Sequence, residues 1–235
     1  MNKISEKPVT PVKITDVLKT ERLLLSFEVF PPKTDTAFGN VRAAALAIAG
    51  LNPAFVSVTY GAGGGTSRYT MEIAREIQEK SGVPSLAHLT CVSSSRETVR
   101  ERISEIRAAG LRNVMALRGD LAPGMSEENR ESWAYHHAVE LVRELKEADP
   151  DFCIGGACYP EVHPESRNQA EDIRHLREKV EAGCEFLTTQ MVFDNPLFFS
   201  FLYKLREAGI RVPVLPGIMP ITSAKHVERA MKLSG

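Results

Sequence analysis

Glu28 has the sequence surroundings that most directly suggest acid–base chemistry. It is the single charged residue in the apolar run from Leu23 to Phe30, which two prolines follow. Since proline cannot continue a strand, the run predicts a short buried strand. A carboxylate there must be paired, neutral or facing a cavity. Two interpretations remain open, a structural ion pair with an arginine or lysine and a general acid whose pKa is raised by burial.

Other polar residues recur further along the chain, each at or directly after an apolar segment. They are Thr59, Tyr60, His88, Thr90, Arg118, Asp120, Glu161, His163 and Gln190. An α/β barrel builds its active site at the carboxyl ends of its strands. Any one of these residues has an ordinary structural explanation, but together with Glu28 they bring six strands to one site, which indicates a functional site.

The elements that must position these residues follow a regular repeat. Expected strands cover residues 26–30, 54–60, 86–91, 114–117, 153–159, 186–190 and 212–215. Amphipathic helical patterns separate them and end near Gly50, Gly82, Gly110, Gly183 and Gly209, where we expect left-handed backbone. A βα repeat of about thirty residues predicts an α/β fold, a (β/α)8 TIM barrel of which about seven units are visible. We expect one catalytic domain over residues 1–235.

Composition excludes several classes of protein. The formal net charge of −1 gives no attraction to nucleic acid or to an anionic membrane. Residues 1–13 lack the apolar core of a secretory signal, and no apolar run is long enough to span a membrane. The four cysteines show no zinc-ligand spacing, so we expect buried free thiols, no metal and a cytoplasmic location.

Two further constellations could bind ligands. The glycine-rich segment 61–66 could cradle phosphate, but it lacks the third glycine of the dinucleotide fingerprint, so a flexible turn is an equal alternative. Arg118, His163 and Lys179 could hold a diphosphate, although Lys179 could equally be a solvated surface lysine. A less favoured interpretation is a metal-dependent barrel lyase that uses a cluster of potential ligands. These are His88, Asp120, Glu161 and His163.

Seven blocks of sequence carry a family resemblance. They are residues 26–33, 56–64, 88–91, 116–121, 159–165, 189–190 and 216–220. In this order, and over nearly the whole chain, they resemble methylenetetrahydrofolate reductases. The resemblance implies a TIM barrel that binds FAD, takes hydride from NAD(P)H and reduces methylenetetrahydrofolate to 5-methyltetrahydrofolate, in a homo-oligomer.

Site residues follow from the matching motif positions. The resemblance implies that Glu28 is the general acid that protonates a folate ring nitrogen, and that Asp120 lies between flavin and pterin. Thr59 and Gln190 would contact nicotinamide and folate in turn, which makes the mechanism ping-pong, and His226 would contact substrate. The implied flavin-binding residues are Thr59, Tyr60, Ala62, His88, Arg118, Gly119, Asp120, His137, Ala138, Tyr159, His163, Ser166, Asp172, His175 and Lys179.

The chain departs from the family pattern at a few positions. His137 stands where the family often has tyrosine, His226 where glutamine is common, and Ala230 where some members have an aromatic residue. The family also continues with an eighth strand and its helix. We therefore expect a fragment, or a short member that another chain completes. A non-catalytic flavin- or folate-binding subunit stays open as an alternative.

Overall fold

Seven parallel strands form one sheet whose order follows the chain. The computed structural model describes residues 12–20, 22–32, 34–61, 67–121, 130 and 132–234. The strands are β1 (Phe27–Val29), β2 (Val56–Val58), β3 (Ser85–Thr90), β4 (Asn113–Leu117), β5 (Cys153–Cys158), β6 (Phe186–Met191) and β7 (Val214–Gly217). The sheet curls into a half-barrel, so the expectation of a TIM-barrel-like α/β fold with seven visible units is confirmed.

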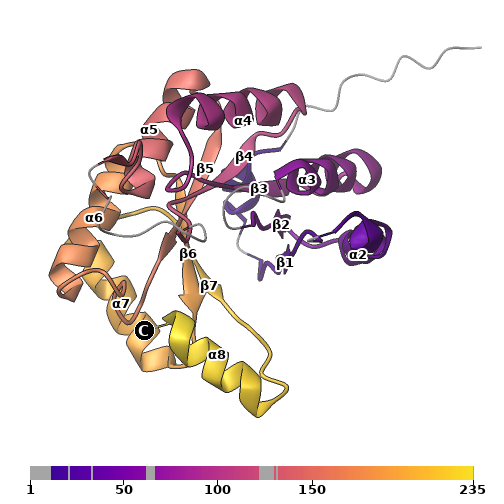
Figure 1. Ribbon diagram of the computed structural model, residues 1–235. Coiled ribbons are helices and arrows are strands. Elements are labelled where there is room, and N and C mark those ends of the chain that lie inside the picture. The colour runs from indigo at the N-terminus through magenta and orange to yellow at the C-terminus, as the bar shows by residue number, and fades with distance from the viewer. Residues whose placement is uncertain are drawn as a thin grey trace, which may run out of the picture.

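A helix follows each strand on the outer side of the sheet. The helices are α2 (Asp35–Ala49), α3 (Ser67–Ser81), α4 (Arg96–Ala108), α5 (Ala138–Ala148), α6 (Gln169–Glu181), α7 (Asn195–Glu207) and α8 (Ala224–Ser234). Figure 1 shows them in an arc from α2 to α8 around the strands, open between β1 and β7. None of the described helices is both long enough and apolar enough to cross a membrane.

The apolar residues divide between two faces of the sheet. Val56 and Val58 of β2 belong to the larger core cluster, which packs the sheet against the helices. The predicted apolar face of α4 joins it through Val99, Ile103 and Ile106, each at most 2% exposed. A second, smaller cluster lies inside the half-barrel and includes Phe55, Leu86, Met115 and Phe186. This separation follows from the period of two along each strand.

A short helix, α1 (Ile14–Val17), closes the amino-terminal end of the half-barrel. Ile14 is fully buried in the inner cluster. Its backbone N–H donates to Oδ1 of buried Asn113 at 2.8 Å, and Nδ2 of Asn113 donates to the carbonyl oxygens of Val12 and Ser85. Asn113 therefore ties α1, which plugs this end of the half-barrel, to β3 and β4, and every polar atom of its amide is hydrogen-bonded.

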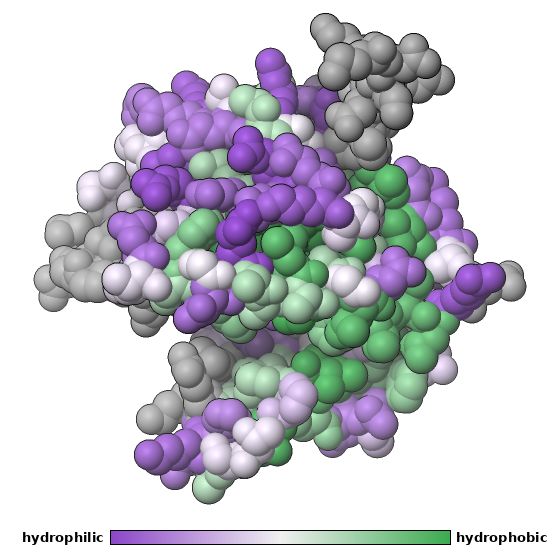
Figure 2. All heavy atoms as spheres, turned by 90° about the vertical axis from the view of Figure 1, so that its right-hand side faces the viewer, coloured by the Kyte–Doolittle hydropathy of each residue, from purple (hydrophilic) through white to green (hydrophobic). Residues whose placement is uncertain are grey.

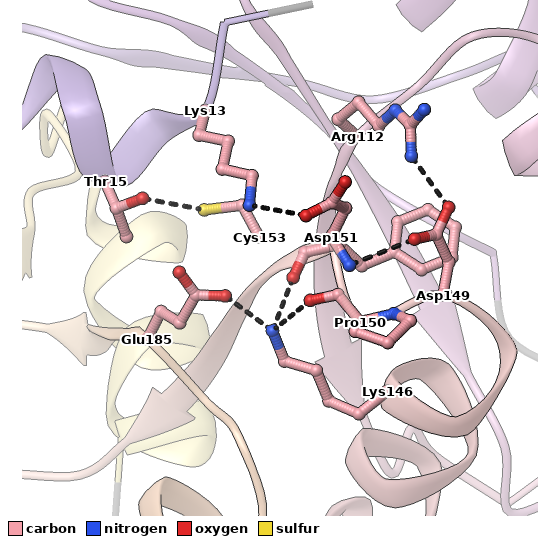
Figure 3. Close-up of polar contacts among 10 residues, drawn as sticks. Lys13, Thr15, Arg112, Lys146, Asp149, Pro150, Asp151, Cys153 and Glu185 are labelled. Carbon is pink, nitrogen blue, oxygen red and sulfur yellow. Dashed lines mark hydrogen bonds and ion pairs between the residues drawn. The ribbon is translucent and has the colours of Figure 1, made fainter.

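Polar contacts around the same end hold the connecting loops (Figure 3). Nζ of Lys146 donates to the carbonyl oxygens of Pro150 and Phe152 and pairs with Glu185 at 2.7 Å. Nearby, Arg112 pairs with Asp149 at 2.7 Å and Lys13 with Asp151 at 3.5 Å. With this end occupied by structural contacts, the carboxyl ends of the strands are the open end of the half-barrel.

The two edge strands expose apolar side chains. Beside β1, Leu25 is 64% and Phe30 69% exposed, and beside β7, Ile218 is 79% exposed. Figure 2 views the side on which α2 and α3 lie and shows hydrophobic residues gathered around a hollow. The expectation that 26–30 forms a buried strand is therefore wrong, because β1 is an edge of the described sheet and only its Val29 is buried.

The predictions for the cysteines are confirmed, and those for the glycines are confirmed in part. All four cysteines are free and buried, as predicted. Four of the five expected left-handed glycines have positive φ, but Gly50 is right-handed at φ −63°, and Asn52 takes the left-handed position at φ 57°. Asparagine adopts that region more readily than most residues. Residues 62–66 of the glycine-rich segment, for which a phosphate cradle and a flexible turn were equal alternatives, lie outside the described residues.

Candidate functional site

Glu28 points to the inner face of the half-barrel. It pairs in register with Ser57 of β2, and the hydroxyl of Ser57 lies 2.6 Å from Nε2 of His88 on β3. The Oε2 atom of Glu28 lies 3.7 Å from the same nitrogen. Since 3.7 Å exceeds hydrogen-bond range, Ser57 is the polar partner of His88 and Glu28 stands next to the pair.

Burial disfavours the charged forms of both Glu28 and His88. His88 is 7% exposed, and loss of solvation lowers its pKa to about 4. The same cause raises the pKa of Glu28. Water reaches 48% of the Glu28 side chain through the open sheet edge, so desolvation acts on it only in part. In the part of the chain that the structure describes, Glu28 pairs with no arginine or lysine, and the general-acid interpretation is the one that its surroundings favour.

The turn after β4 carries Arg118, Gly119 and Asp120. Gly119 has φ +83°, and a Cβ there would lie 2.7 Å from Cβ of Thr90. Only glycine fits this position without strain. The loop after β3 braces the turn, since the backbone N–H groups of Cys91 and Val92 donate to the carbonyl oxygen of Arg118. The backbone of Arg118 and Gly119 is therefore fixed at the open end of the half-barrel.

Arg118 forms a bidentate ion pair with Glu165 from the loop after β5. Nη1 donates to Oε2 at 2.7 Å, and Nη2 donates to Oε1. The backbone N–H of Glu165 also donates to Nδ1 of His163 at 3.1 Å. An Nδ1 that accepts a hydrogen bond carries no proton, so Nε2 bears the N–H, and burial lowers the pKa of His163. Sequence reasoning assigned no role to Glu165, because nothing in its spacing links it to Arg118.

The turn from Tyr159 to His163 is strained and orders two rings. Val162 has φ +126°, which is rare for a β-branched residue and typical of functional loops. The rings of Tyr159 and His163 meet edge to face with centroids 4.7 Å apart. Oε2 of Glu161 is buried with no hydrogen-bond partner among the described residues, so it remains available to a ligand donor.

Gln190 lies at an irregularity in β6. The register with β7 shifts between Thr188 and Met191, and Gly217 donates its backbone N–H to the hydroxyl of Thr189. Such bulges bend a strand and redirect side chains beside functional sites. Oε1 of Gln190 accepts the N–H of Met191, and its side chain hydrogen-bonds to Tyr159. The structure thus joins two residues predicted at the ends of β5 and β6.

The start of α6 places a buried carboxylate beside the same loop. Asp172 is 6% exposed and accepts the backbone N–H of His163 at 3.2 Å and the hydroxyl of Ser166 at 3.3 Å. Lys179 is not a solvated surface lysine, since its Nζ donates to the carbonyl oxygen of Ala157 at 2.8 Å. Asp172 therefore orders the loop, whereas Lys179 ties α6 to β5.

Two further histidines of the predicted set lie together. The rings of His137 and His175 stack with centroids 6.0 Å apart, from the start of α5 and from α6. Burial is the main cause that lowers the pKa of His137. Ala138 opens α5 directly after His137. These residues extend the polar site along the α5–α6 side.

The remaining predicted residues are Thr59, Tyr60, Ala62 and His226. Tyr60 packs partly against the outer core, and the carbonyl oxygen of Thr59 accepts the hydroxyl of Thr70. Ala62 lies outside the described residues. His226 is exposed on α8, where its ring bonds with Thr222, on the β7 side of the opening.

The proposed metal set does not gather. Among the residues that the structure describes, no group of three or more histidine, cysteine, aspartate or glutamate side chains could hold a metal ion. His88 bonds with Ser57 and His163 accepts from Glu165, so both rings have other partners. The geometry therefore gives no support to a metal-dependent lyase.

The donors at the open end suit an anionic ligand. The guanidinium of Arg118 has five N–H groups, of which the ion pair uses two. Nε2–H of His163 adds a neutral donor beside it. A phosphate or diphosphate group matches such a set.

Searches among known proteins agree on the family. The family model of methylenetetrahydrofolate reductase matches residues 13–235. The chain is 38% identical over 208 residues to 5,10-methylenetetrahydrofolate reductase of Pectobacterium carotovorum subsp. carotovorum, which covers 88% of this chain and 67% of that protein. It is 38% identical over 231 residues to methylenetetrahydrofolate reductase 1 of Schizosaccharomyces pombe, covering 95% of this chain but 38% of that longer protein.

Solved structures of low identity share the fold. A Clostridium thermocellum protein that binds two copies of 5-methyl-5,6,7,8-tetrahydrofolic acid matches with a TM-score of 0.64 at 16% identity, over 94% of this chain and 75% of that one. A 2,3-dimethylmalate lyase matches with a TM-score of 0.56 at 10% identity, over 94% and 86%. At such identities the likeness shows the fold alone. The family match rests on the sequence, and by it the chain belongs to the methylenetetrahydrofolate reductase family.

Proposed function

We propose that the protein reduces 5,10-methylenetetrahydrofolate to 5-methyltetrahydrofolate, with NAD(P)H as hydride donor and FAD as cofactor. The observation that carries the proposal is Glu28, whose carboxyl group faces the inner side of the half-barrel with a raised pKa. Family membership supplies the reaction type. One hydride and one proton enter the substrate for each NAD(P)H oxidised, so the site must supply an acid.

Glu28 is the proton donor in this proposal. Its carboxyl group protonates a ring nitrogen of the substrate, which opens the methylene bridge to an iminium that accepts hydride. Desolvation raises the pKa of Glu28 and so favours its protonated form, and neutral His88 beside it does not stabilise the carboxylate as a cationic partner would. Ser57 holds His88 in place through the 2.6 Å contact.

The donor set at the strand ends fits FAD. When bound, FAD would relay the hydride between nicotinamide and folate. Arg118 and Nε2–H of His163 would hold its phosphate groups, and the stacked His137 and His175 lie on the neighbouring side of the site. The buried, unpartnered Oε2 of Glu161 offers an acceptor for a ligand hydroxyl or N–H group.

Folate and nicotinamide share the remaining polar groups in this proposal. Asp120 is exposed at the end of β4 and contacts the pterin. Thr59 and Gln190 serve the two substrates in turn, and the bond to Tyr159 fixes the Gln190 side chain in advance. His226 on α8 contacts folate from the far side of the opening. The protein works as a homo-oligomer, and its four buried free thiols suit the reducing cytoplasm.

A second candidate is a flavin- or folate-binding subunit without turnover. The observation that favours it is the Glu28 side chain, which is 48% exposed to water on β1. Two half-reactions distinguish the candidates. Anaerobic bleaching of the flavin by NADH or NADPH, followed by reoxidation with methylenetetrahydrofolate, establishes the reductase. Flavin binding without either step establishes the subunit.

A further inference from the structure

Glu165 connects two parts of the site that the chain itself keeps apart. Its carboxylate makes the bidentate pair with Arg118, 47 residues away in the sequence. Its backbone N–H donates to Nδ1 of His163. One residue of the β5 loop thus contacts both donors that suit a phosphate group.

The partial exposure of the pair limits what it adds to stability. The Glu165 side chain is 41% exposed and that of Arg118 is 20% exposed. Water competes for the exposed carboxylate, so the pair adds at most modestly to folding stability. A bidentate geometry does, however, fix the plane of the guanidinium.

The pair leaves most of the guanidinium free to act. Glu165 takes one N–H from each of Nη1 and Nη2, so one N–H remains on each and Nε–H is unused by the pair. At His163, the bond from Glu165 occupies Nδ1 and leaves Nε2–H as the outward donor. Glu165 therefore orients both groups without occupying their remaining donors.

We propose that Glu165 is a positioning residue, which holds Arg118 and His163 in the orientation that binds the diphosphate of a dinucleotide cofactor. The inference rests on the proposed FAD site and adds to it a residue that itself touches no phosphate. The opposite arrangement would make Glu165 a competitor that occupies the place of the anion. The two arrangements predict opposite signs, because removing a competing carboxylate tightens anion binding.

The test compares three ligands on the full chain. FAD carries a diphosphate and an isoalloxazine ring, ADP carries only the diphosphate end, and riboflavin carries only the ring. Each is titrated against wild type and Glu165→Gln, by flavin fluorescence for FAD and riboflavin and by calorimetry for ADP. Glutamine keeps the shape of the side chain but carries no charge and has a single acceptor oxygen, so it cannot form the two-oxygen pair with Nη1 and Nη2. Glu181→Gln is the matched control, because it breaks an exposed pair with Arg177 at 3.3 Å on α6.

We expect Glu165→Gln to weaken FAD and ADP binding about tenfold, as when one charge-assisted hydrogen bond is lost, with riboflavin binding unchanged. Glu181→Gln should match wild type for all three ligands. In an Arg118→Ala background the Glu165→Gln change should have no further effect, since the two residues act as one unit.

Three results would overturn the inference. Tighter or unchanged FAD and ADP binding by Glu165→Gln would reject it while leaving the flavin site intact. Equal weakening of all three ligands would show general damage to the site rather than a role at the phosphates. A wild-type chain that binds neither FAD nor ADP would overturn both this inference and the proposed cofactor.

Discussion

Oε2 of Glu28 and Nε2 of His88 lie 3.7 Å apart on the inner face of the half-barrel, and loss of solvation disfavours the charged form of each. A carboxyl group beside a protonated histidine would lose its proton easily, because the positive charge stabilises the carboxylate. Beside a histidine whose pKa is about 4, it keeps its proton to higher pH. This relationship makes Glu28 suitable as an acid and leads to the first two predictions.

Glu28→Gln keeps the shape of the side chain and removes the acid. Flavin reduction by NAD(P)H should survive in this variant, because that step needs no proton from Glu28. Methylenetetrahydrofolate reduction should fall about 10²- to 10⁴-fold, the usual contribution of a general acid. Stopped-flow measurement of the two half-reactions checks this, and an equal loss in both would remove Glu28 from its assigned role.

His88 should make the protein less stable in mild acid. Its pKa is about 4 in the fold against about 6.5 unfolded, so the unfolded chain takes up a proton first as the pH falls. The contribution of neutral His88 to the free energy of unfolding is fully present above pH 6.5. It is lost between pH 6.5 and 4, and the loss is about 3 kcal/mol at most. Urea unfolding of wild type and His88→Gln from pH 4 to 7.5 measures this slope.

The matched control for His88 is His226→Gln, since His226 is exposed. Glu28 opposes the acid destabilisation caused by His88. Because its pKa is raised in the fold, the folded state binds the Glu28 proton more tightly than the unfolded chain does, and this adds stability as the pH falls. We therefore expect a steeper acid loss in Glu28→Gln and a shallower one in His88→Gln. Parallel curves for wild type and His88→Gln would contradict the neutral, buried state of His88.

Gly119→Ala should destabilise the fold and the site together. The new Cβ would lie 2.7 Å from Cβ of Thr90, at a backbone φ of +83°. Gly82→Ala is the control, since its φ is +70° and nothing lies within 4 Å. We expect a cost of about 1 kcal/mol at Gly82 and about 2–4 kcal/mol at Gly119, measured by urea unfolding. Equal costs would mean that the turn does not press against Thr90.

Asn113→Leu should release the plug formed by α1. It leaves the N–H of Ile14 and the carbonyl oxygens of Val12 and Ser85 without their partner, at an expected cost of about 2–4 kcal/mol. Amide hydrogen exchange should rise first in α1. Asn168→Ala removes a single exposed cap bond on α6 and should cost about 1 kcal/mol. Unchanged protection of α1 would show that Asn113 does not anchor it.

Much of the fold was predictable because the βα repeat imposes parallel strands. Parallel strands bring their carboxyl ends to one edge, which is why residues as distant as Tyr159 and Gln190 could be expected together. The alternation in β2 also places Ser57 on the face of Thr59, a signal that sequence reasoning did not use. The exposure of β1 could not be predicted, since an apolar run does not show which strand lies at the edge.

The contacts of individual side chains could not be predicted from the sequence. Nothing in the spacing of Arg118 and Glu165 selects that carboxylate from its neighbours, because the pairing depends on how two loops fold over the strand ends. The strained φ of Val162 is likewise invisible, since valine ordinarily avoids it. From the sequence, Lys179 could be a phosphate ligand or a solvated surface residue. In the structure its Nζ instead donates to the carbonyl oxygen of Ala157, a role that neither interpretation included.

A visible spectrum of the purified full chain tests the proposed reductase most directly; a colourless chain is first incubated with FAD and freed of unbound flavin. We expect a bound-flavin spectrum that NADH or NADPH bleaches and that methylenetetrahydrofolate restores. A protein that is still colourless after this treatment, or whose bound flavin is never reoxidised by the folate, would contradict the proposed reductase.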